Sequence, residues 1–208
     1  MDDPLFLRLL QDGVPFVFVG RHPNERVNYV DVDNVGGARM AVEHLIRLGH
    51  TRIATITGPL RMTSGADRLA GYCQALEAHQ LAVDENLMVE GDYTEASGSI
   101  GMQRLLSASP TAIFAASDIM AVGALKALRE ANLRVPEDVA LVGFDDAPIA
   151  AAVEPALTTV QQPIERLGSM AADLLLNLLG HPPDAQAPAN RIILPIKLAV
   201  RESCGAMH

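Results

Sequence analysis

The sequence predicts an α/β protein built from doubly wound parallel sheets. Short segments that are continuously apolar alternate with segments in which apolar residues recur at helical spacing. Strands without in-and-out alternation are covered on both faces, which is typical of parallel sheets. Strands that alternate with helices form right-handed βαβ units. With 208 residues, 49% of them hydrophobic, the chain is long enough to bury a substantial core.

The continuously apolar segments mark most of the expected strands. Residues 28–32 instead alternate between apolar and polar side chains, as a strand with one covered face would. The expected strands are residues 15–20, 28–32, 52–57, 87–90, 112–116, 139–143, 192–195 and 197–200.

Helical spacing and capping signals predict five helices between these strands. Asn34 is suited to cap the first helix, and Gly49 is suited to end it. The second helix is expected at about residues 65–79, and Thr94 is suited to cap the third.

Asp118 is suited to cap the fourth helix. That helix is expected to stop near Asn132, because asparagine tolerates the left-handed conformation that ends helices. Pro163 suits the first turn of the fifth helix, and Gly180 suits its end. The residues expected to face inward from the fifth helix are Ile164, Leu167, Ala171, Leu174, Leu175 and Leu178.

The charge balance and the cysteines indicate which partners and which cellular compartment the sequence favours. Sixteen Lys and Arg against twenty-five Asp and Glu give a formal net charge of −9, which disfavours direct binding of nucleic acid by this chain. Cys73 and Cys204 form no metal or redox motif and are most simply free thiols in a reducing compartment. Met1 is followed by acidic residues rather than by a basic stretch, and uncharged runs are too short for a bilayer. We expect a cytoplasmic protein without a membrane partner.

Ligands of open parallel sheets bind outside the carboxyl ends of the strands, where helix N-termini point inward. This rule selects four loops that carry polar or aromatic residues: 58–68, 91–93, 117–118 and 144–146. Because all four loops gather at one edge, we expect a binding site for a small polar ligand there.

Arg68 and Asp145 are two candidates on these loops, and each allows a structural alternative. Arg68 could donate two hydrogen bonds to a carboxylate or a vicinal diol, or it could pair with Asp67 or Glu90. Asp145 could accept hydrogen bonds from a ligand, or it could stiffen the turn at residues 145–148.

The remaining candidates also allow two interpretations. For Asp118, the role of a helix N-cap is favoured over that of a ligand contact. Ser117 is either a turn residue or a residue whose hydroxyl contacts the ligand weakly. Tyr93 could stack on a sugar or a base, or it could belong to the core. Met62 and Ser64 lie in a loop long enough to reach a ligand, but either could equally face solvent.

No motif of an enzyme is present. The chain lacks a GxSxG elbow, a P-loop, a GxGxxG turn and an HExxH helix. His44 and His50 flank the end of a helix, where a turn or capping role is favoured over metal binding. Asp31 and Asp33 share one face of a strand, but no second cluster of metal ligands accompanies them. We therefore expect no enzymatic activity, no cofactor and no metal.

A series of short motifs covers almost the whole chain. They are VDNVGG at 32–37, HLIRLGHTRI at 44–53, GPL at 58–60, RLAGY at 68–72, GDYT at 91–94, PTA at 110–112, SDIMA at 117–121, RVPEDV at 134–139, VGFDD at 142–146, PALTTVQQP at 155–163 and VRES at 200–203. In order and spacing, this series resembles the effector-sensing core of the LacI/GalR family of bacterial transcriptional repressors.

The resemblance implies a periplasmic-binding-protein-like fold of two doubly wound α/β lobes joined by three crossing segments. The first lobe would comprise residues 1–32 plus 162–191, and the second would comprise residues 34–160 plus 193–206. Relative to the family, the first lobe is truncated, and the DNA-reading helix-turn-helix head is absent. The net charge of −9 fits that absence, because the basic head would make most phosphate contacts.

Carried over by position, the resemblance implies seven effector contacts. Arg68 would supply a cation fork and Asp145 an acceptor, on opposite sides of a polar ligand. The family's dimer surface would involve Val122, on the helix after Asp118, and the apolar run at 147–153. The implied effector contacts are Met62, Ser64, Arg68, Tyr93, Ser117, Asp118 and Asp145.

The resulting hypothesis is the effector-sensing and dimerisation core of a transcriptional regulator. Its effector would be a sugar, a sugar derivative or a nucleobase, and its protein partner a second copy of the chain. Operator DNA would be contacted only through the helix-turn-helix head, whose binding the effector modulates by shifting the population of lobe arrangements. Two alternatives stay open: a sugar-binding receptor of a transport system, and an enzyme that uses Asp145 and Asp146.

Overall fold

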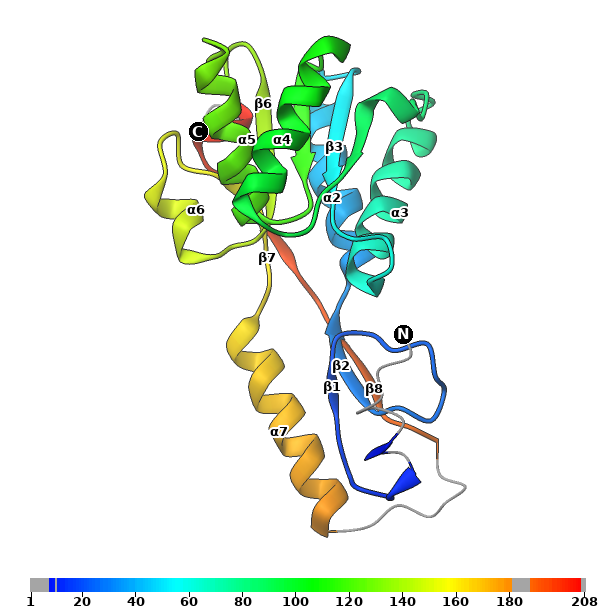
Figure 1. Cartoon of the computed structure of the whole chain (residues 1–208). Helices are drawn as coiled ribbons and strands as arrows, with labels where there is room; N and C mark the ends of the chain where they lie inside the picture. Colours follow the sequence, from blue (N-terminus) through cyan, green and yellow to red (C-terminus); the bar gives the residue numbers. More distant parts are fainter. Residues whose placement is uncertain (1–7, 10, 181–187, 207–208) are drawn as a thin grey trace. The chain divides into compact units, whose positions relative to one another are not determined.

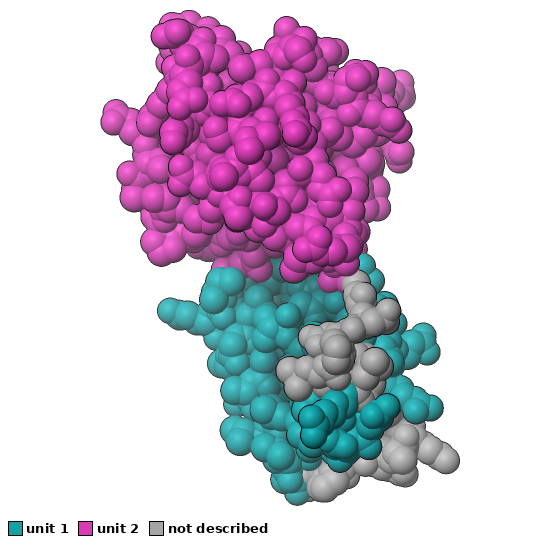
Figure 2. All heavy atoms as spheres, viewed as in Figure 1, with its two compact units in different colours: residues 1–33, 163–195 teal, residues 34–162, 196–208 magenta. Residues whose placement is uncertain are grey.

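The structure is a computed structural model that describes residues 8–9, 11–180 and 188–206. The chain forms two compact units, each assembled from separate stretches of sequence (Figure 2). Unit 1 contains Met1–Asp33 and Pro163–Pro195, and unit 2 contains Asn34–Gln162 and Ile196–His208.

Unit 1 holds a three-stranded parallel sheet in the order β1-β2-β8. These strands are β1 (Phe18–Val19), β2 (Tyr29–Val32) and β8 (Arg191–Leu194), so the first is shorter than the predicted strand at 15–20. The sheet packs against α7 (Ile164–Gly180) (Figure 1). The helix ends at Gly180, as predicted, and begins one residue after Pro163, which the sequence placed in its first turn.

The apolar stripe of α7 begins one turn later than the sequence predicts. Leu167, Leu174 and Leu178 are buried, and Ala171 and Leu175 are half-buried. The prediction that Ile164 faces inward is wrong, since 61% of this residue is exposed. Ile164 is the first residue of the helix, whereas the buried stripe starts at Leu167.

Unit 2 is built on a six-stranded sheet in the order β4-β3-β5-β6-β7-β9, in which β9 alone runs antiparallel to its neighbour. The sequence did not predict β7 as a strand, because its two threonines break the apolar run that marks the other central strands. The strands are β3 (Ile53–Thr57), β4 (Met88–Glu90), β5 (Ala112–Ala115), β6 (Ala140–Asp145), β7 (Thr158–Gln161) and β9 (Lys197–Ala199).

Helices cover both faces of this sheet, as the sequence predicts for a doubly wound fold (Figure 1). Along β5, Phe114 packs with the residues of α2 and α3, while Ile113 packs with those of α4 and α5. Both faces of the strand are therefore dry, which explains its continuously apolar sequence. The helices of unit 2 are α2 (Asn34–Arg47), α3 (Thr63–Ala78), α4 (Glu95–Leu105), α5 (Asp118–Glu130) and the short α6 (Pro148–Ala152).

Two helix ends lie where capping residues in the sequence predicted them. The Thr94 side chain accepts a hydrogen bond from the Ser97 N–H at 3.1 Å and caps α4. Asn132 takes a left-handed conformation, with φ of 58°, just beyond the end of α5. In the described part of the chain, no helix is both long and apolar enough to cross a bilayer.

The helices α4 and α5 pack backbone against backbone at two glycines. A Cβ atom at Gly98 would collide with the Met120 carbonyl oxygen, and one at Gly123 would collide with the Glu95 carbonyl oxygen. Both obstacles are backbone atoms, which cannot swing aside as a flexible side chain can. The close approach of α4 and α5 therefore requires the absence of side chains at these positions.

We expect Gly123→Ala to lower the free energy of unfolding by about 1–3 kcal/mol, because the added methyl group forces two helices apart. Gly168→Ala is the matched control: its Cβ would meet none of the described residues within 4 Å, and alanine favours a helix by roughly 0.5–1 kcal/mol. Urea unfolding followed by circular dichroism measures both variants. Equal stability of Gly123→Ala and the parent chain would contradict the proposed packing.

Candidate functional site

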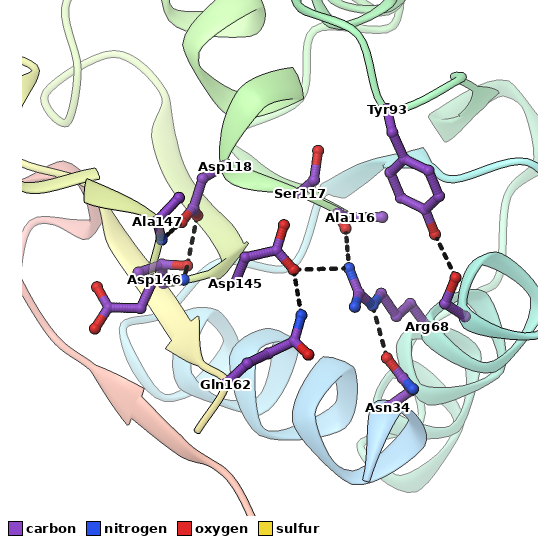
Figure 3. A network of polar contacts seen from close by, with 12 residues as sticks. Asn34, Arg68, Tyr93, Ala116, Ser117, Asp118, Asp145, Asp146, Ala147 and Gln162 are labelled. Atoms are coloured by element: carbon purple, nitrogen blue, oxygen red, sulfur yellow. Dashed lines mark hydrogen bonds and ion pairs between the residues drawn. The ribbon is translucent and has the colours of Figure 1, made fainter. Parts of the chain in front are cut away.

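A buried arginine lies at the carboxyl edge of the unit 2 sheet (Figure 3). Arg68 lies in the second turn of α3, and only 5% of it is exposed. Its Nε donates to Asn34 Oδ1 at 2.9 Å, and its Nη1 donates to the Ala116 carbonyl oxygen at 2.6 Å and to Asp145 Oδ1 at 3.2 Å. These contacts hold the guanidinium in one orientation.

An aromatic ring covers one face of this guanidinium. The Cζ atom of Arg68 lies 3.7 Å from the centre of the Phe144 ring, a cation–π contact in a dry environment. Within the described residues, Nη2 of Arg68 has no hydrogen-bond partner. Arg68 thus presents one donor nitrogen while its remaining polar atoms are engaged.

Asp145 is the acidic partner, at the end of β6. The structure excludes the alternative pairing of Arg68 with Glu90, which instead accepts a hydrogen bond from the Leu60 N–H. The Gln162 amide donates to Asp145 Oδ1 at 2.5 Å. Burial raises the pKa of the Asp145 carboxyl, and Arg68 and Gln162 lower it in part. Among the residues described, Oδ2 of Asp145 has no hydrogen-bond partner.

Ser117, rather than Asp118, caps α5. The Ser117 side chain accepts a hydrogen bond from the Met120 N–H at 3.2 Å, so the prediction that Asp118 is the N-cap is wrong by one residue. Serine is as good a cap as aspartate, and sequence alone does not choose between two adjacent capping residues. Asp118 is the first residue of the helix.

The Asp118 carboxylate is fully buried and connects α5 to β7 and to the turn after β6. It accepts hydrogen bonds from the Thr159 hydroxyl at 2.5 Å and from the Ala147 N–H at 2.8 Å. Gly143 leaves room for it, because a Cβ there would collide with the carboxylate. Burial raises the pKa of Asp118 to about 7, despite the opposing effect of its two hydrogen bonds.

The aromatic and hydroxyl candidates form a second contact. The Tyr93 and Ser64 hydroxyl groups lie 2.9 Å apart, which links the loop after β4 to the start of α3. The Tyr93 ring lies against Gly58, where a side chain would collide with it. Met62 precedes α3 and is 45% exposed, so it faces solvent in this structure.

Three residues that contact the Arg68–Asp145 pair were not predicted in that role from the sequence. Asn34 was interpreted as a helix cap, yet its Oδ1 accepts from Arg68. Gln162 follows β7 at the carboxyl edge of the sheet, so the rule that selected the other loops would have found it if β7 had been predicted. Phe144 lies beside Asp145 in sequence, but its contact with Arg68 has no local signal.

A shallow depression of about 330 Å³ lies in the loops after β3 and β4. It is lined by Pro59, Arg61, Glu90, Gly91, Asp92 and Ser97, and by none of the seven predicted effector contacts. The described residues contain no group of three or more His, Cys, Asp or Glu side chains that could hold a metal ion.

Protonation of Asp118 should make stability depend on pH. Between the ordinary aspartate pKa near 3.8 and the native pKa of about 7, the folded chain binds a proton that the unfolded chain has released. The free energy of unfolding, relative to Asp118→Asn, should therefore fall as pH rises from 4 to 7, by on the order of 2–4 kcal/mol.

Urea titrations at a series of pH values test this expectation. Asp138→Asn is the control, because the exposed Asp138 pairs with Arg134 and its pKa is lowered to about 2, below the tested range. A stability difference between the parent chain and Asp118→Asn that stays flat from pH 4 to pH 7 would show that Asp118 is already ionised.

Comparison with known proteins identifies the family. The model of the periplasmic binding protein-like domain matches residues 42–204. The HTH-type transcriptional regulator CelR of Thermobifida fusca is 47% identical over 207 residues, which cover 97% of this chain and 60% of that protein. The structure of a CelR–cellobiose complex, 46% identical, superposes with a TM-score of 0.92 and covers 97% of this chain and 62% of that chain.

This chain covers a larger share of a second solved structure. The LacI-family regulatory protein from Chloroflexus aggregans is 37% identical, with a TM-score of 0.88 over 98% of this chain and 73% of that chain. The present chain thus spans about three fifths of the CelR protein and about three quarters of the Chloroflexus chain. It belongs to the LacI family of regulatory proteins and contains the family's periplasmic binding protein-like domain.

Proposed function

We propose that this chain is the effector-sensing and dimerisation core of a LacI-type transcriptional regulator, acting in the cytoplasm without catalysing a reaction. The observation that carries the proposal is the Arg68–Asp145 pair, which leaves one donor nitrogen and one acceptor oxygen without partners among the described residues. The name of the relative CelR, a transcriptional regulator, favours this role over that of a transport receptor.

The charges of the pair favour a neutral effector. The guanidinium of Arg68 and the carboxylate of Asp145 compensate one another, so an ionic ligand would leave one of them uncompensated. A hydroxyl group both donates and accepts, and a vicinal diol can therefore satisfy Nη2 of Arg68 and Oδ2 of Asp145 together. The relative solved with cellobiose is consistent with a carbohydrate of this kind.

The proposed site draws on the remaining predicted residues in different ways. Tyr93 and Ser64 offer an aromatic ring and a hydroxyl, and Met62, two residues before Ser64 in sequence, is exposed. Ser117 and Asp118 contribute by shaping the start of α5 and the turn after β6, since both side chains are engaged within the protein. The two lobes of the family correspond in this proposal to units 1 and 2.

Regulation follows from a population shift. An effector stabilises one conformation of the core over another by the difference in its affinity for the two. In a dimer, that conformation sets how the paired helix-turn-helix heads, which lie outside these 208 residues, meet operator DNA. The net charge of −9 disfavours phosphate binding by this chain itself.

We expect calorimetric titration to show binding of cellobiose and weaker binding, by at least tenfold, of the anionic glucose 6-phosphate. Asp145→Asn should weaken cellobiose binding by about 10- to 100-fold, which corresponds to roughly 1.4–2.7 kcal/mol for a charge-assisted hydrogen bond. Arg134→Gln, which breaks an exposed Arg–Asp pair in the same unit, serves as the control. Unchanged affinity of Asp145→Asn would reject the proposed site.

The dimer surface is proposed at α5 and α6. Ile119 on α5 and Ile149 on α6 are 43% and 36% exposed, and the two helices are in contact. Such exposed aliphatic side chains on adjoining helices suit an isologous interface between two copies.

We expect Ile149→Lys to weaken dimerisation by at least tenfold, because it places a charge in a desolvated interface. Ile100→Lys is the matched control, since Ile100 is 50% exposed on α4. Analytical ultracentrifugation measures both. If the Ile149→Lys variant remained dimeric at the concentrations at which the parent chain is dimeric, the interface would lie elsewhere.

A further inference from the structure

The segment that carries Asp145 has an unusual backbone. Asp145 has φ of 120° and Asp146 has φ of 57°, so two consecutive residues other than glycine occupy the left-handed half of conformational space. Such conformations cost on the order of 1–3 kcal/mol each and persist only when surrounding contacts hold them. The orientation of the Asp145 carboxylate therefore depends on whatever fixes the turn after β6.

Side chains from several separate elements contact the three residues of this turn. Gln162 and Arg68 hold the Asp145 carboxylate, and Asp118 accepts a hydrogen bond from the Ala147 N–H. The residue between them, Asp146, contributes both of its carboxylate oxygens: the Gln161 amide donates to Oδ2, and Arg201 donates to Oδ1.

Arg201 comes from the segment that follows β9, far from the turn in sequence. Its Nη2 lies 2.6 Å from Asp146 Oδ1, and its Nη1 donates to the Leu157 carbonyl oxygen at 2.8 Å. Its backbone N–H donates to the Thr158 hydroxyl at 2.8 Å. The guanidinium thus bridges the turn after β6 and the chain entering β7.

The Arg201–Asp146 pair is shielded from water. The Asp146 side chain is 10% exposed and the Arg201 side chain is 24% exposed. In the Arg134–Asp138 pair, by contrast, the aspartate side chain is 31% exposed and the arginine side chain is 70% exposed. Ion pairs in a shielded environment keep a defined geometry, and removal of one partner leaves the other charge poorly solvated. None of the seven predicted effector contacts touches Arg201 among the hydrogen bonds of the described residues.

We propose that Arg201 is a positioning residue for the effector site, which holds Asp146 in its left-handed conformation and thereby directs the Asp145 carboxylate toward Arg68 and the effector. This inference rests on the proposed function of the Arg68–Asp145 pair. It predicts that effector affinity depends on a side chain that does not touch the effector.

The test uses the whole 208-residue chain and three arginine variants. Arg201→Gln keeps a donor but removes the charge that pairs with Asp146, and Arg201→Lys restores the charge. Arg134→Gln is the matched control: Arg134 pairs with Asp138 at 2.9 Å but lies before β6, at the opposite end of the strand from Asp146. Circular dichroism first establishes that each variant is folded.

Two readouts are compared, the calorimetric affinity for cellobiose and the NMR resonance of the Arg68 Nε–H group in the effector-free chain. We expect Arg201→Gln to weaken cellobiose binding at least tenfold and to shift the Arg68 resonance. Arg134→Gln should change affinity by less than twofold and leave the resonance in place. Arg201→Lys should recover affinity to within about threefold of the parent chain. A merely structural role for Arg201 would move the unfolding midpoint but not the Arg68 resonance.

The outcomes distinguish the positioning role of Arg201 from the proposed binding of a carbohydrate. If the parent chain binds cellobiose and folded Arg201→Gln binds it within twofold, the positioning role is overturned while the proposed function stands. If the parent chain does not bind cellobiose, the carbohydrate proposal fails, and an unmoved Arg68 resonance in Arg201→Gln would overturn the positioning role as well. If Arg201→Gln does not fold, Asp146→Asn takes its place, because it breaks the same ion pair, and the same thresholds apply.

Discussion

A buried guanidinium at the carboxyl edge of the unit 2 sheet is the feature on which the proposed activity depends. A charge placed there is stable only if its surroundings compensate it. Asp145 supplies the opposite charge, Asn34 and the Ala116 carbonyl oxygen accept hydrogen bonds, and the Phe144 ring covers one face. The same contacts that stabilise Arg68 leave Nη2 pointing at no protein acceptor among the described residues. Stabilisation of the charge and readiness to bind a ligand therefore have one structural cause.

The parallel sheet brings these groups together. Because β3, β5, β6 and β7 all run in the same direction, the residues that follow them meet at one edge although they are far apart in sequence. The turn after β6 adds a constraint of its own, since Asp145 and Asp146 have positive φ. Contacts from α5, from the end of β7 and from the C-terminal segment hold that turn. The fold thus maintains a strained backbone at the point where an effector is proposed to bind.

The parts of this arrangement that follow local rules could be predicted from the sequence. Thr94 caps α4 and Asn132 ends α5, because a capping side chain or a left-handed residue acts within a few positions of itself. The edge rule for parallel sheets brought Arg68 and Asp145 to one edge, but it did not predict their direct ion pair, since the resemblance placed them on opposite sides of a ligand. The acceptor role of Asn34 could not be predicted, since it depends on a partner 34 positions away. The strand β7 was missed because its threonines are buried through hydrogen bonds rather than through apolar contact, as the Thr159–Asp118 bond shows.

Membership of the LacI family fixes the fold, while the proposed choice of effector rests on two atoms, Nη2 of Arg68 and Oδ2 of Asp145. A crystal structure of the chain grown with cellobiose tests that choice most directly. We expect a sugar hydroxyl within hydrogen-bond distance of each of these two atoms. Cellobiose seated instead in the depression lined by Arg61, Glu90 and Asp92, with the Arg68–Asp145 pair untouched, would contradict it.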